Sequence, residues 1–488
     1  MMRTTMWSMI LSLVVVFPSS GGSVWAQEFN PQYTRKVRPN VPPIPDQYKP
    51  TLEKLIPPAK HFFQIYGVKR GETVVLINSR WWDPLWPRAW REAGRQLGIV
   101  VDTIWVAPVS RTSSPIMFDM GTARERWWPK YLLGILDEAD WVSVSHDIGV
   151  TLGDIWSRAG GGGQGQKKAK RFLGPHIPYS SEQLAYTPWS MYPVELDLAI
   201  QRKVWEFLDY YGDKAKKIRI TDPLGTDFTF TLLIDKEWVK ENFGEAPRGD
   251  HIPRVTYLTS HHSVYMRHSK NYDPQGVMVL NSTHYGPQPT MKLHLNKGRI
   301  RVEGGGSFGE FMQGQMAKYA NVEYPVQLGV DGSPVTVGAH YLLSVAIGTH
   351  PKAVRGEFFS PTYYRDQGSY WTWNQGMRRA GVLHFSCGDP LQGRYASKKI
   401  PQGVAPFKPN CGHLYFATMT VDGKPLIKDG HLTVLDDPEI RKLASKFGDP
   451  DELLKEAWYP SLEEARRGWP NSQVEDRWPN AASHYGLE

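Results

Sequence analysis

Cysteine is nearly missing from this sequence of 488 residues, which contains only Cys387 and Cys411. Two cysteines cannot build the dense disulfide framework of a small secreted domain. Three states stay open for the pair: one disulfide, two separate thiols, or thiolate ligands of a metal. A disulfide needs an oxidising compartment, and the export signal described next favours that state.

Long apolar runs are also missing, because no stretch approaches the roughly 18 apolar residues of a transmembrane helix. One short apolar run, 9–17, follows the basic Arg3 and precedes the small Ala26. This order predicts a cleaved secretory signal peptide over residues 1–26, with a retained membrane anchor as the alternative. We therefore expect a periplasmic or secreted chain with no integral membrane segment in its mature form.

Basic residues are not gathered into one patch, although the formal net charge is +8. The densest basic run is 166–171, whereas a protein that binds nucleic acid concentrates its positive charge on one face or arm. We expect no nucleic-acid partner. The sequence is instead rich in aromatic residues, with 19 Trp and 23 Tyr. Many of these belong in a core, and the rest suit a pocket for a small aromatic or sugar-like molecule.

The first half of the chain alternates strand and helix. A proline-rich arm over 27–50 precedes it, and the expected domain covers 51–215. Apolar β-branched runs separated by stretches of helical periodicity predict parallel strands with right-handed crossovers, an open α/β sandwich. The expected strands are 72–78, 100–106 and 141–145, and the expected helices are 87–97, 124–138 and 181–211. The glycine run 160–165 lacks a preceding strand and a Gly-Lys-Ser/Thr ending, so we interpret it as a surface loop and not a phosphate loop.

The second half, 216–435, changes to short strands and glycine turns, which predicts a mostly antiparallel β domain. Residues 436–488 return to helix and loop and are expected to wrap around the body. The expected strands of the β domain are 218–222, 228–233, 276–280, 291–295, 300–302, 342–347, 381–387 and 413–420.

Five segments of the second half, in order, carry a resemblance to a known family. They are ITDPLGTDFTF at 220–230, GRIRVEGG at 298–305, AIGTHP at 346–351, LHFSCGD at 383–389, and CGH at 411–413 with the later VDG and DG turns. Together they resemble the aminopeptidase T superfamily of metallopeptidases, which includes proteins similar to 2,5-dihydroxypyridine 5,6-dioxygenase. The resemblance covers about residues 60 to 435, and over the first domain it is one of pattern alone. It implies a metal-dependent enzyme on this fold and a homodimer.

The same resemblance places metal ligands at His384 and His413, but this chain departs from the family at the acidic positions. Ser344 and Tyr415 stand where the family has a glutamate and an aspartate, and Arg254 lies near a third carboxylate position. Bridging carboxylates offset the repulsion between two metal ions. Their loss disfavours a two-metal peptidase and leaves a single metal on histidines, Fe(II) in preference to Zn(II).

Several other residues are candidates for the site. Tyr415 is expected to ligate the metal or to hydrogen-bond bound oxygen, and His284 lies on a loop at a strand end, where functional residues are common. Each histidine has the alternative of a purely structural or surface role. Candidates for additional ligands are His261, His262, His268, Glu303 and Glu357, and those for substrate stacking are Tyr370, Trp371 and Trp373.

The sequence therefore predicts an exported mononuclear metal enzyme, a non-haem iron oxygenase that acts on a small aromatic or heteroaromatic substrate. Two alternatives stay open. One is a metal-dependent hydrolase or aminopeptidase of the same fold, and the other is a non-catalytic binding protein that kept the scaffold.

Overall fold

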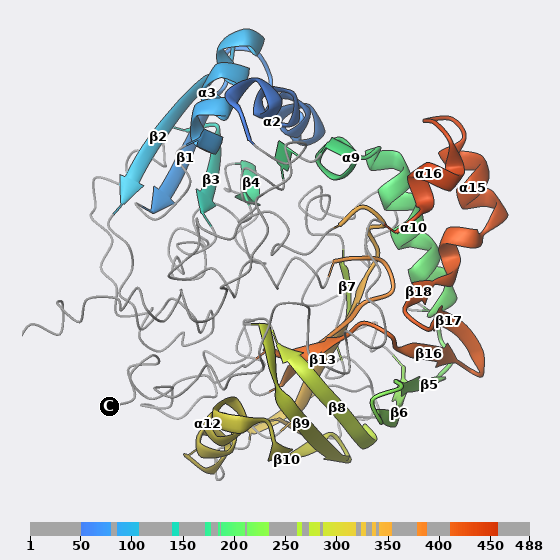
Figure 1. The fold of residues 1–488 in the computed structure, drawn as a ribbon. Coiled ribbons are helices and arrows are strands. Elements are labelled where there is room, and N and C mark those ends of the chain that lie inside the picture. The colour runs from blue at the N-terminus through green and yellow to red at the C-terminus, as the bar shows by residue number, and fades with distance from the viewer. Residues whose placement is uncertain are drawn as a thin grey trace, which may run out of the picture.

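The computed structural model describes residues 50–79, 85–106, 139–145, 171–176, 184–185, 187–209, 212–233, 261–265, 273–283, 286–318, 324–327, 334–337, 341–353, 378–387 and 410–456. The expected signal peptide, most of the proline-rich arm, the helix expected at 124–138, the glycine run and the end of the C-terminal wrap lie outside these ranges. Within them the chain combines helices with four sheets (Figure 1).

A four-stranded parallel sheet forms the N-terminal part, in the order β2-β1-β3-β4. Its parallel pairing confirms what the strand–helix alternation predicts. Two helices pack their aromatic residues together beside it, and the ring of Trp90 lies 4.8 Å from that of Phe62 and 5.5 Å from that of Trp86. The elements are α2 (Leu52–Tyr66), β1 (Thr73–Ser79), α3 (Leu85–Leu97), β2 (Val100–Val106), β3 (Trp141–Ser145) and β4 (Arg171–His176).

The helix expected over 181–211 is interrupted in the structure. A short helix, α9 (Thr187–Ser190), ends before Pro193, and α10 (Val194–Phe207) begins directly after it. Proline has no amide proton and restricts the residue before it, so it starts a helix more readily than it continues one. Helices α15 (Pro438–Ala444) and α16 (Pro450–Leu454) pack beside α10, and Lys203 of α10 forms an ion pair with Glu439 of α15 (Figure 1).

An eight-stranded antiparallel sheet dominates the second half, in the order β10-β9-β8-β6-β5-β16-β17-β18. Its strands alternate, so that Ile218 and Ile220 are buried while Lys217 and Arg219 are exposed. This period of two is what the sequence pattern predicts for a sheet with one wet face. The strands are β5 (Lys216–Thr221), β6 (Asp227–Leu232), β8 (Gln275–Thr283), β9 (Gly286–Asn296), β10 (Arg299–Gly304), β16 (Thr418–Val421), β17 (Lys424–Lys428) and β18 (His431–Leu432).

A second antiparallel sheet, of four strands in the order β15-β14-β13-β7, packs against the first. The rings of Phe228 on β6 and Phe385 on β14 meet edge to face with centroids 5.9 Å apart, so part of the hydrophobic core lies between the two sheets. The strands are β7 (His261–Tyr265), β13 (Leu342–Gly348), β14 (Leu383–Cys387) and β15 (Asn410–Leu414); helix α12 (Gly306–Lys318), the hairpin β11 (Tyr324–Gln327) and β12 (Pro334–Val337), and the 3₁₀ turn η7 (Thr433–Asp436) complete the described elements.

The single strand expected over 413–420 is wrong. The chain forms β15 up to Leu414, leaves the four-stranded sheet, and joins the eight-stranded sheet as β16 from Thr418. The three residues that connect these two strands along the chain are buried: Tyr415 is 3% exposed, Phe416 6% and Ala417 0%. A continuous apolar run can therefore cross between two sheets, and periodicity alone does not reveal the crossing.

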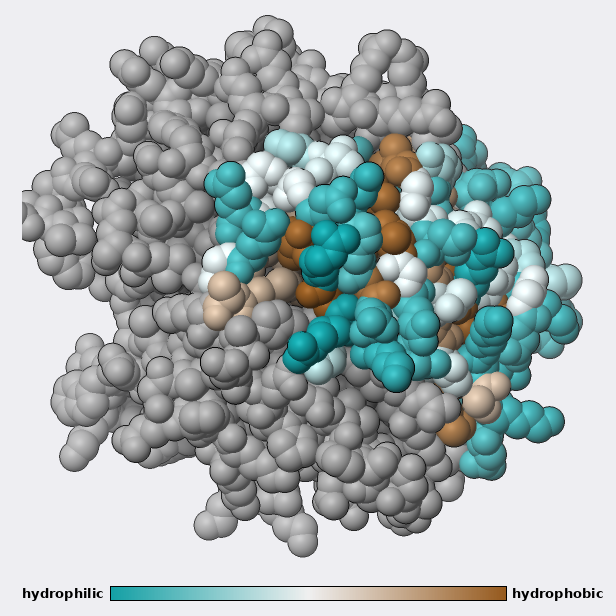
Figure 2. Space-filling view, turned by 90° about the horizontal axis from the view of Figure 1, so that it is seen from below, coloured by the Kyte–Doolittle hydropathy of each residue, from teal (hydrophilic) through white to brown (hydrophobic). Residues whose placement is uncertain are grey.

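The surface is largely polar where it is described. Figure 2 shows a mainly hydrophilic face on which hydrophobic residues appear as patches between polar side chains. Among the described residues, no helix has the length and apolar character needed to cross a membrane.

Candidate functional site

His384 and His413 lie next to each other in the four-stranded sheet. They are direct partners in the antiparallel register of β14 and β15, so both side chains leave the sheet on the same face. Their ring centroids are 5.2 Å apart, with the ring planes at 73°. Both side chains are buried, at 6% and 1% exposure. The structure thus brings together the two histidines that the sequence singles out.

The neighbouring strand β13 places a small residue beside His384. Ala346 of β13 is the partner of His384 on the side away from His413, and it contributes only a methyl group. All five residues of β14 are buried, so His384 projects from a strand with no exposed position.

Each imidazole has a hydroxyl partner two residues along the chain. The Ser386 hydroxyl lies 3.3 Å from Nε2 of His384, and the Tyr415 hydroxyl lies 3.0 Å from Nδ1 of His413. The sequence predicts that Tyr415 ligates the metal or contacts bound oxygen, whereas here it hydrogen-bonds to a histidine. Such a partner fixes the orientation and tautomer of the ring it contacts.

Burial also sets the charge of His413. Desolvation lowers the pKa of His413 to about 3, because the protein interior disfavours the imidazolium. His413 is therefore neutral at neutral pH. A neutral imidazole is the form that binds metals.

A disulfide lies at the end of the same strand. Cys387 of β14 is disulfide-bonded, and the sequence holds one other cysteine, Cys411, in the neighbouring strand β15. Of the three states that the sequence leaves open for Cys387, the structure has the disulfide. This covalent link joins the two strands that carry the histidines.

Glu303, one of the predicted additional ligands, lies elsewhere. Its carboxylate is 2.7 Å from Nε2 of His294 on the neighbouring strand β9, and its side chain is 49% exposed. Among the described residues, no group of three or more His, Cys, Asp or Glu side chains is arranged to hold a metal ion. The structure therefore gives Glu303 a surface ion pair and no place beside His384 and His413.

Two further histidine candidates lie on the edge strand of the same sheet. His261 and His262 of β7 pair with Gly348 and Ile347 of β13, so they are two strands away from His384. Ser344, at the position where the family resemblance expects a glutamate, is a buried residue of β13. Other predicted site residues lie outside the described part of the chain: Arg254, His268, His284, Glu357, Tyr370, Trp371 and Trp373.

Sequence reasoning missed a buried polar residue near the end of β13. His350 is 1% exposed, its Nδ1 accepts a hydrogen bond from the amide of Lys352 at 3.1 Å, and its ring packs on Tyr192 with centroids 4.6 Å apart. Burial, reinforced by the charges of Lys352 and Arg378, lowers the pKa of His350 to about 3. Its position inside the AIGTHP segment was the only available signal.

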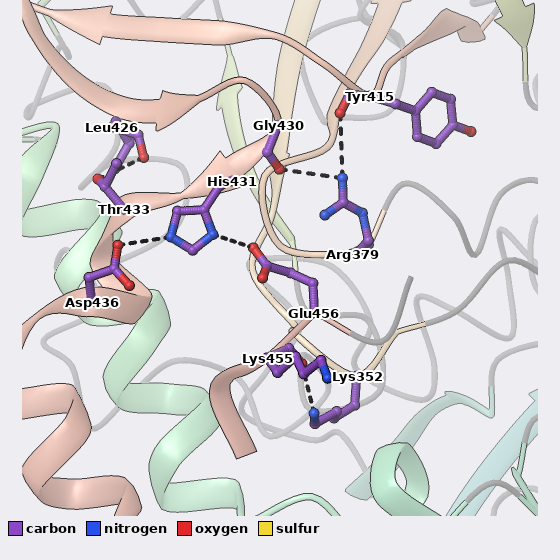
Figure 3. Close-up of polar contacts among 10 residues, drawn as sticks. All are labelled: Lys352, Arg379, Tyr415, Leu426, Gly430, His431, Thr433, Asp436, Lys455 and Glu456. Carbon is purple, nitrogen blue, oxygen red and sulfur yellow. Dashed lines mark hydrogen bonds and ion pairs between the residues drawn. The ribbon is translucent and has the colours of Figure 1, made fainter. Parts of the chain in front are cut away.

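A second missed residue, Arg379, is fully buried and lies five positions before His384 in the sequence. Its Nη2 donates to the backbone carbonyls of Tyr415 at 3.4 Å and Gly430 at 3.3 Å (Figure 3). A buried arginine was not predictable from its sequence context, because arginine is almost never fully buried unless paired.

Comparisons by sequence found no matching family model and no matching curated protein. Comparison of structures found a 2,5-dihydroxypyridine dioxygenase from Pseudomonas putida KT2440, at 14% identity and a TM-score of 0.44, over 80% of this chain and 99% of that one. It also found wild-type AmpT from Thermus thermophilus, at 13% identity and a TM-score of 0.40, over 78% of this chain and 99% of that one. Both likenesses are distant and concern the fold alone.

Proposed function

We propose that this chain is an enzyme that uses one divalent transition metal, Fe(II) in preference to Zn(II), to oxidise a small aromatic or heteroaromatic substrate. The observation that carries the proposal is the pairing of His384 with His413 inside the protein. Burying two polar rings side by side costs free energy that an apolar pair would not. A metal-binding role accounts for that cost.

The spacing of the two rings fits a shared metal. Two imidazoles that bind one ion at N–metal distances of about 2.1 Å have ring centres roughly 4.5–5.3 Å apart. The separation of 5.2 Å between His384 and His413 falls inside this range. The neutral state of His413 supports the same assignment, because a metal competes with a proton for the imidazole nitrogen.

The hydroxyl partners indicate which nitrogen of each imidazole would bind the metal. Because the Tyr415 oxygen lies at Nδ1 of His413, a metal would bind His413 through Nε2, and the remaining proton on Nδ1 would be donated to Tyr415. By the same argument His384 would bind through Nδ1 and donate from Nε2 to Ser386. Tyr415 and Ser386 would thus hold the two ligands in one tautomer and one orientation.

The ligand chemistry favours one metal over two. No described Asp or Glu side chain joins His384 and His413 in a metal-binding group. A two-metal hydrolytic centre depends on carboxylates that bridge its ions. A single Fe(II) on few protein ligands keeps open positions at which oxygen and an aromatic substrate bind together.

The test is metal binding followed by oxygen uptake. We expect the purified protein, reconstituted with Fe(II) without oxygen, to hold close to one iron per chain by elemental analysis. His384→Ala and His413→Ala should each lose most of this iron. His294→Ala is the matched control, since His294 is a surface histidine paired with Glu303, and it should keep the metal. Absence of metal from the wild-type protein would end the proposal.

The reaction class is tested with the same variants. We expect the iron-loaded protein to consume oxygen with dihydroxylated benzenes or pyridines, and the His384 and His413 variants to be inactive. Release of the aryl amine from a leucine anilide after loading with Zn(II) or Co(II) would assign the site to hydrolysis instead. Ligand binding that survives both alanine substitutions would indicate a non-catalytic binding protein.

We also propose that the chain is exported. The N-terminal order of basic, apolar and small residues supports this, and so does the disulfide at Cys387, since disulfides persist in oxidising compartments. Sequencing the N-terminus of protein recovered from the periplasm or medium tests it. A chain that begins near Gln27 is expected, and an uncleaved cytoplasmic chain would contradict export.

A further inference from the structure

We propose that Arg379 is a positioning residue, which holds the Tyr415 backbone so that the Tyr415 hydroxyl stays on Nδ1 of His413. The proposal deepens the function proposed above and depends on it for the ligand of the site. The contact between Arg379 and Tyr415 involves protein atoms alone, so it can be tested in protein prepared without metal.

The first observation is the double hydrogen bond of Arg379. A single nitrogen, Nη2, donates to the carbonyls of Tyr415 and Gly430, which belong to separate segments of the chain. Figure 3 shows the guanidinium between these carbonyls while the Tyr415 ring points away from it. Arg379 is fully buried, and its Nη2 lies 3.4 Å from the Tyr415 oxygen and 3.3 Å from the Gly430 oxygen. The guanidinium thus acts on the backbone of Tyr415 and leaves its phenol to His413.

The second observation is that the backbone of Gly430 contacts both segments that carry the site histidines. Its amide donates to the carbonyl of Ala417 at 2.9 Å, just beyond Tyr415. Its carbonyl faces Gly381, where an added Cβ would lie only 2.0 Å from the Gly430 oxygen. Gly381 lies three residues before His384, so the backbone of one residue, Gly430, contacts the segment that enters β14 and the segment that leaves β15.

The third observation is where the sheet pairing stops. The register of β14 and β15 ends at the pair Leu383–Leu414, so Tyr415 is already outside the ladder. Arg379 donates to the carbonyl of Tyr415, one residue after the ladder ends. The orientation of the Tyr415 hydroxyl toward His413 follows from where this backbone is held.

The experiment measures the tautomer of His413 in the metal-free protein by long-range ¹H–¹⁵N NMR with labelled histidine, assigned with His413→Asn. We expect one dominant tautomer in the wild type and a mixture in Tyr415→Phe, which lacks the hydroxyl. Arg379→Met should show a similar mixture. Arg379→Lys keeps a buried cation with several N–H donors and should recover most of the wild-type population.

A double substitution separates positioning from general destabilisation. If Arg379 acts through Tyr415, Arg379→Met combined with Tyr415→Phe should change the tautomer population no further than Tyr415→Phe alone, because the two residues share one pathway. Gly71→Ala, a substitution in the first domain, is the control for destabilisation and should leave the tautomer unchanged. A wild-type tautomer ratio in folded Arg379→Met, or additive effects in the double variant, would overturn the proposal.

Binding of Co(II) connects this result to the site. We expect about tenfold weaker Co(II) binding in Arg379→Met and in Tyr415→Phe, with a matching change in the visible spectrum, and near wild-type behaviour in Arg379→Lys. If the wild type binds no Co(II), the proposed metal function fails, while the NMR result still decides whether Arg379 positions Tyr415. The two proposals therefore fail on different measurements.

Discussion

Gly381 combines two requirements that only glycine meets. Its φ of +85° lies in the left-handed region, and a Cβ at this position would lie 2.0 Å from the carbonyl oxygen of Gly430. Gly71 has the same φ of +85°, but nothing lies within 4 Å of its hypothetical Cβ. A comparison of substitutions at these two glycines therefore distinguishes the cost of a strained φ from the cost of steric overlap.

We predict that Gly381→Ala destabilises the protein by roughly 2–4 kcal/mol, because a backbone oxygen cannot move aside as a flexible side chain can. Gly71→Ala should cost only about 1 kcal/mol, from the strained φ alone. Urea unfolding of both variants beside the wild type measures the difference. Equal losses in the two variants would show that the contact with Gly430 does not constrain Gly381.

Individual site residues could be predicted only where a local sequence segment identifies them. The LHFSCGD and CGH segments identified His384 and His413 by resemblance, and the register of β14 with β15 then placed them side by side. Arg379 and the hydroxyl contact of Tyr415 were not predictable, because both depend on a backbone path between two sheets. The hydrogen bond of Arg379 joins residues 36 positions apart in sequence, which no local pattern encodes, whereas the hydroxyl contact of Tyr415 joins residues only two positions apart.

At the level of elements, the C-terminal segment 449–456 is held by contacts from the side chains of His431 and Lys352. The His431 ring lies between two carboxylates, with Nδ1 2.6 Å from Glu456 and Nε2 2.9 Å from Asp436 (Figure 3). Lys352 donates to the backbone carbonyls of Glu452 and Lys455. A short helix thus depends on contacts from outside itself, as expected for so few turns.

His431 makes this attachment dependent on pH. The hydrogen bond to Glu456, supported by Asp436, raises the pKa of His431 to about 9. Lys352 interacts electrostatically with Glu456 and also with Glu452 and Lys455, so these charged groups lie near the pair as well. A raised pKa means that the folded protein binds the proton more tightly than the unfolded chain does. The stabilisation is therefore complete below about pH 6.5 and is lost as the pH rises through about 9.

We predict that the wild type loses roughly 1–2 kcal/mol of stability between pH 6 and pH 10 through this group, a figure reduced for solvent screening because His431 is 34% exposed. His431→Gln should flatten this part of the pH profile. The protection factors of the amides of residues 449–456 in hydrogen exchange, which are corrected for the base-catalysed intrinsic rate, should fall at high pH in the wild type only. His294→Gln, which also loses a carboxylate contact, is the control. An unchanged profile in His431→Gln would refute the assignment.

At the level of elements, period-two strands were predicted well and less regular elements were not. Ile218 and Ile220 on β5 show the alternation that the sequence indicates. Helix α12 was missed because it begins at the last of three consecutive glycines, Gly304 to Gly306, which favour a loop. Strand β4 was missed because it contains Gly174 and Pro175, both poor strand formers. In each case tertiary packing outweighs local propensity.

For the whole molecule, the disulfide at Cys387 is the covalent constraint. The two cysteines are 24 positions apart in the sequence. A cross-link over a loop of this length contributes about 3 kcal/mol, mainly by restricting the unfolded chain. We predict that Cys387→Ser, or reduction of the wild type, lowers the midpoint of thermal unfolding. Melting of the oxidised and reduced wild type measures this, and identical melting curves would show that the disulfide has no effect on stability.

The fold class could be predicted from the sequence, but the order in which the strands pair could not. The sequence predicts a parallel α/β part followed by an antiparallel β part, and both appear among the described residues. Division of the β part into two packed sheets was not predicted, because β16 pairs with β5 across about two hundred intervening residues. Strand order is set by how all the strands share one core, which a single sequence does not display.

The buried connection Tyr415–Phe416–Ala417 carries the chain from one sheet to the other immediately after His413. Because these three residues are buried and connect the two sheets directly, we expect a displacement of one sheet to displace the other as well. Thermal fluctuations would move the two imidazoles together as parts of one stiff body. Their separation should therefore stay nearly constant before any ligand arrives, so that little entropy is lost when one binds.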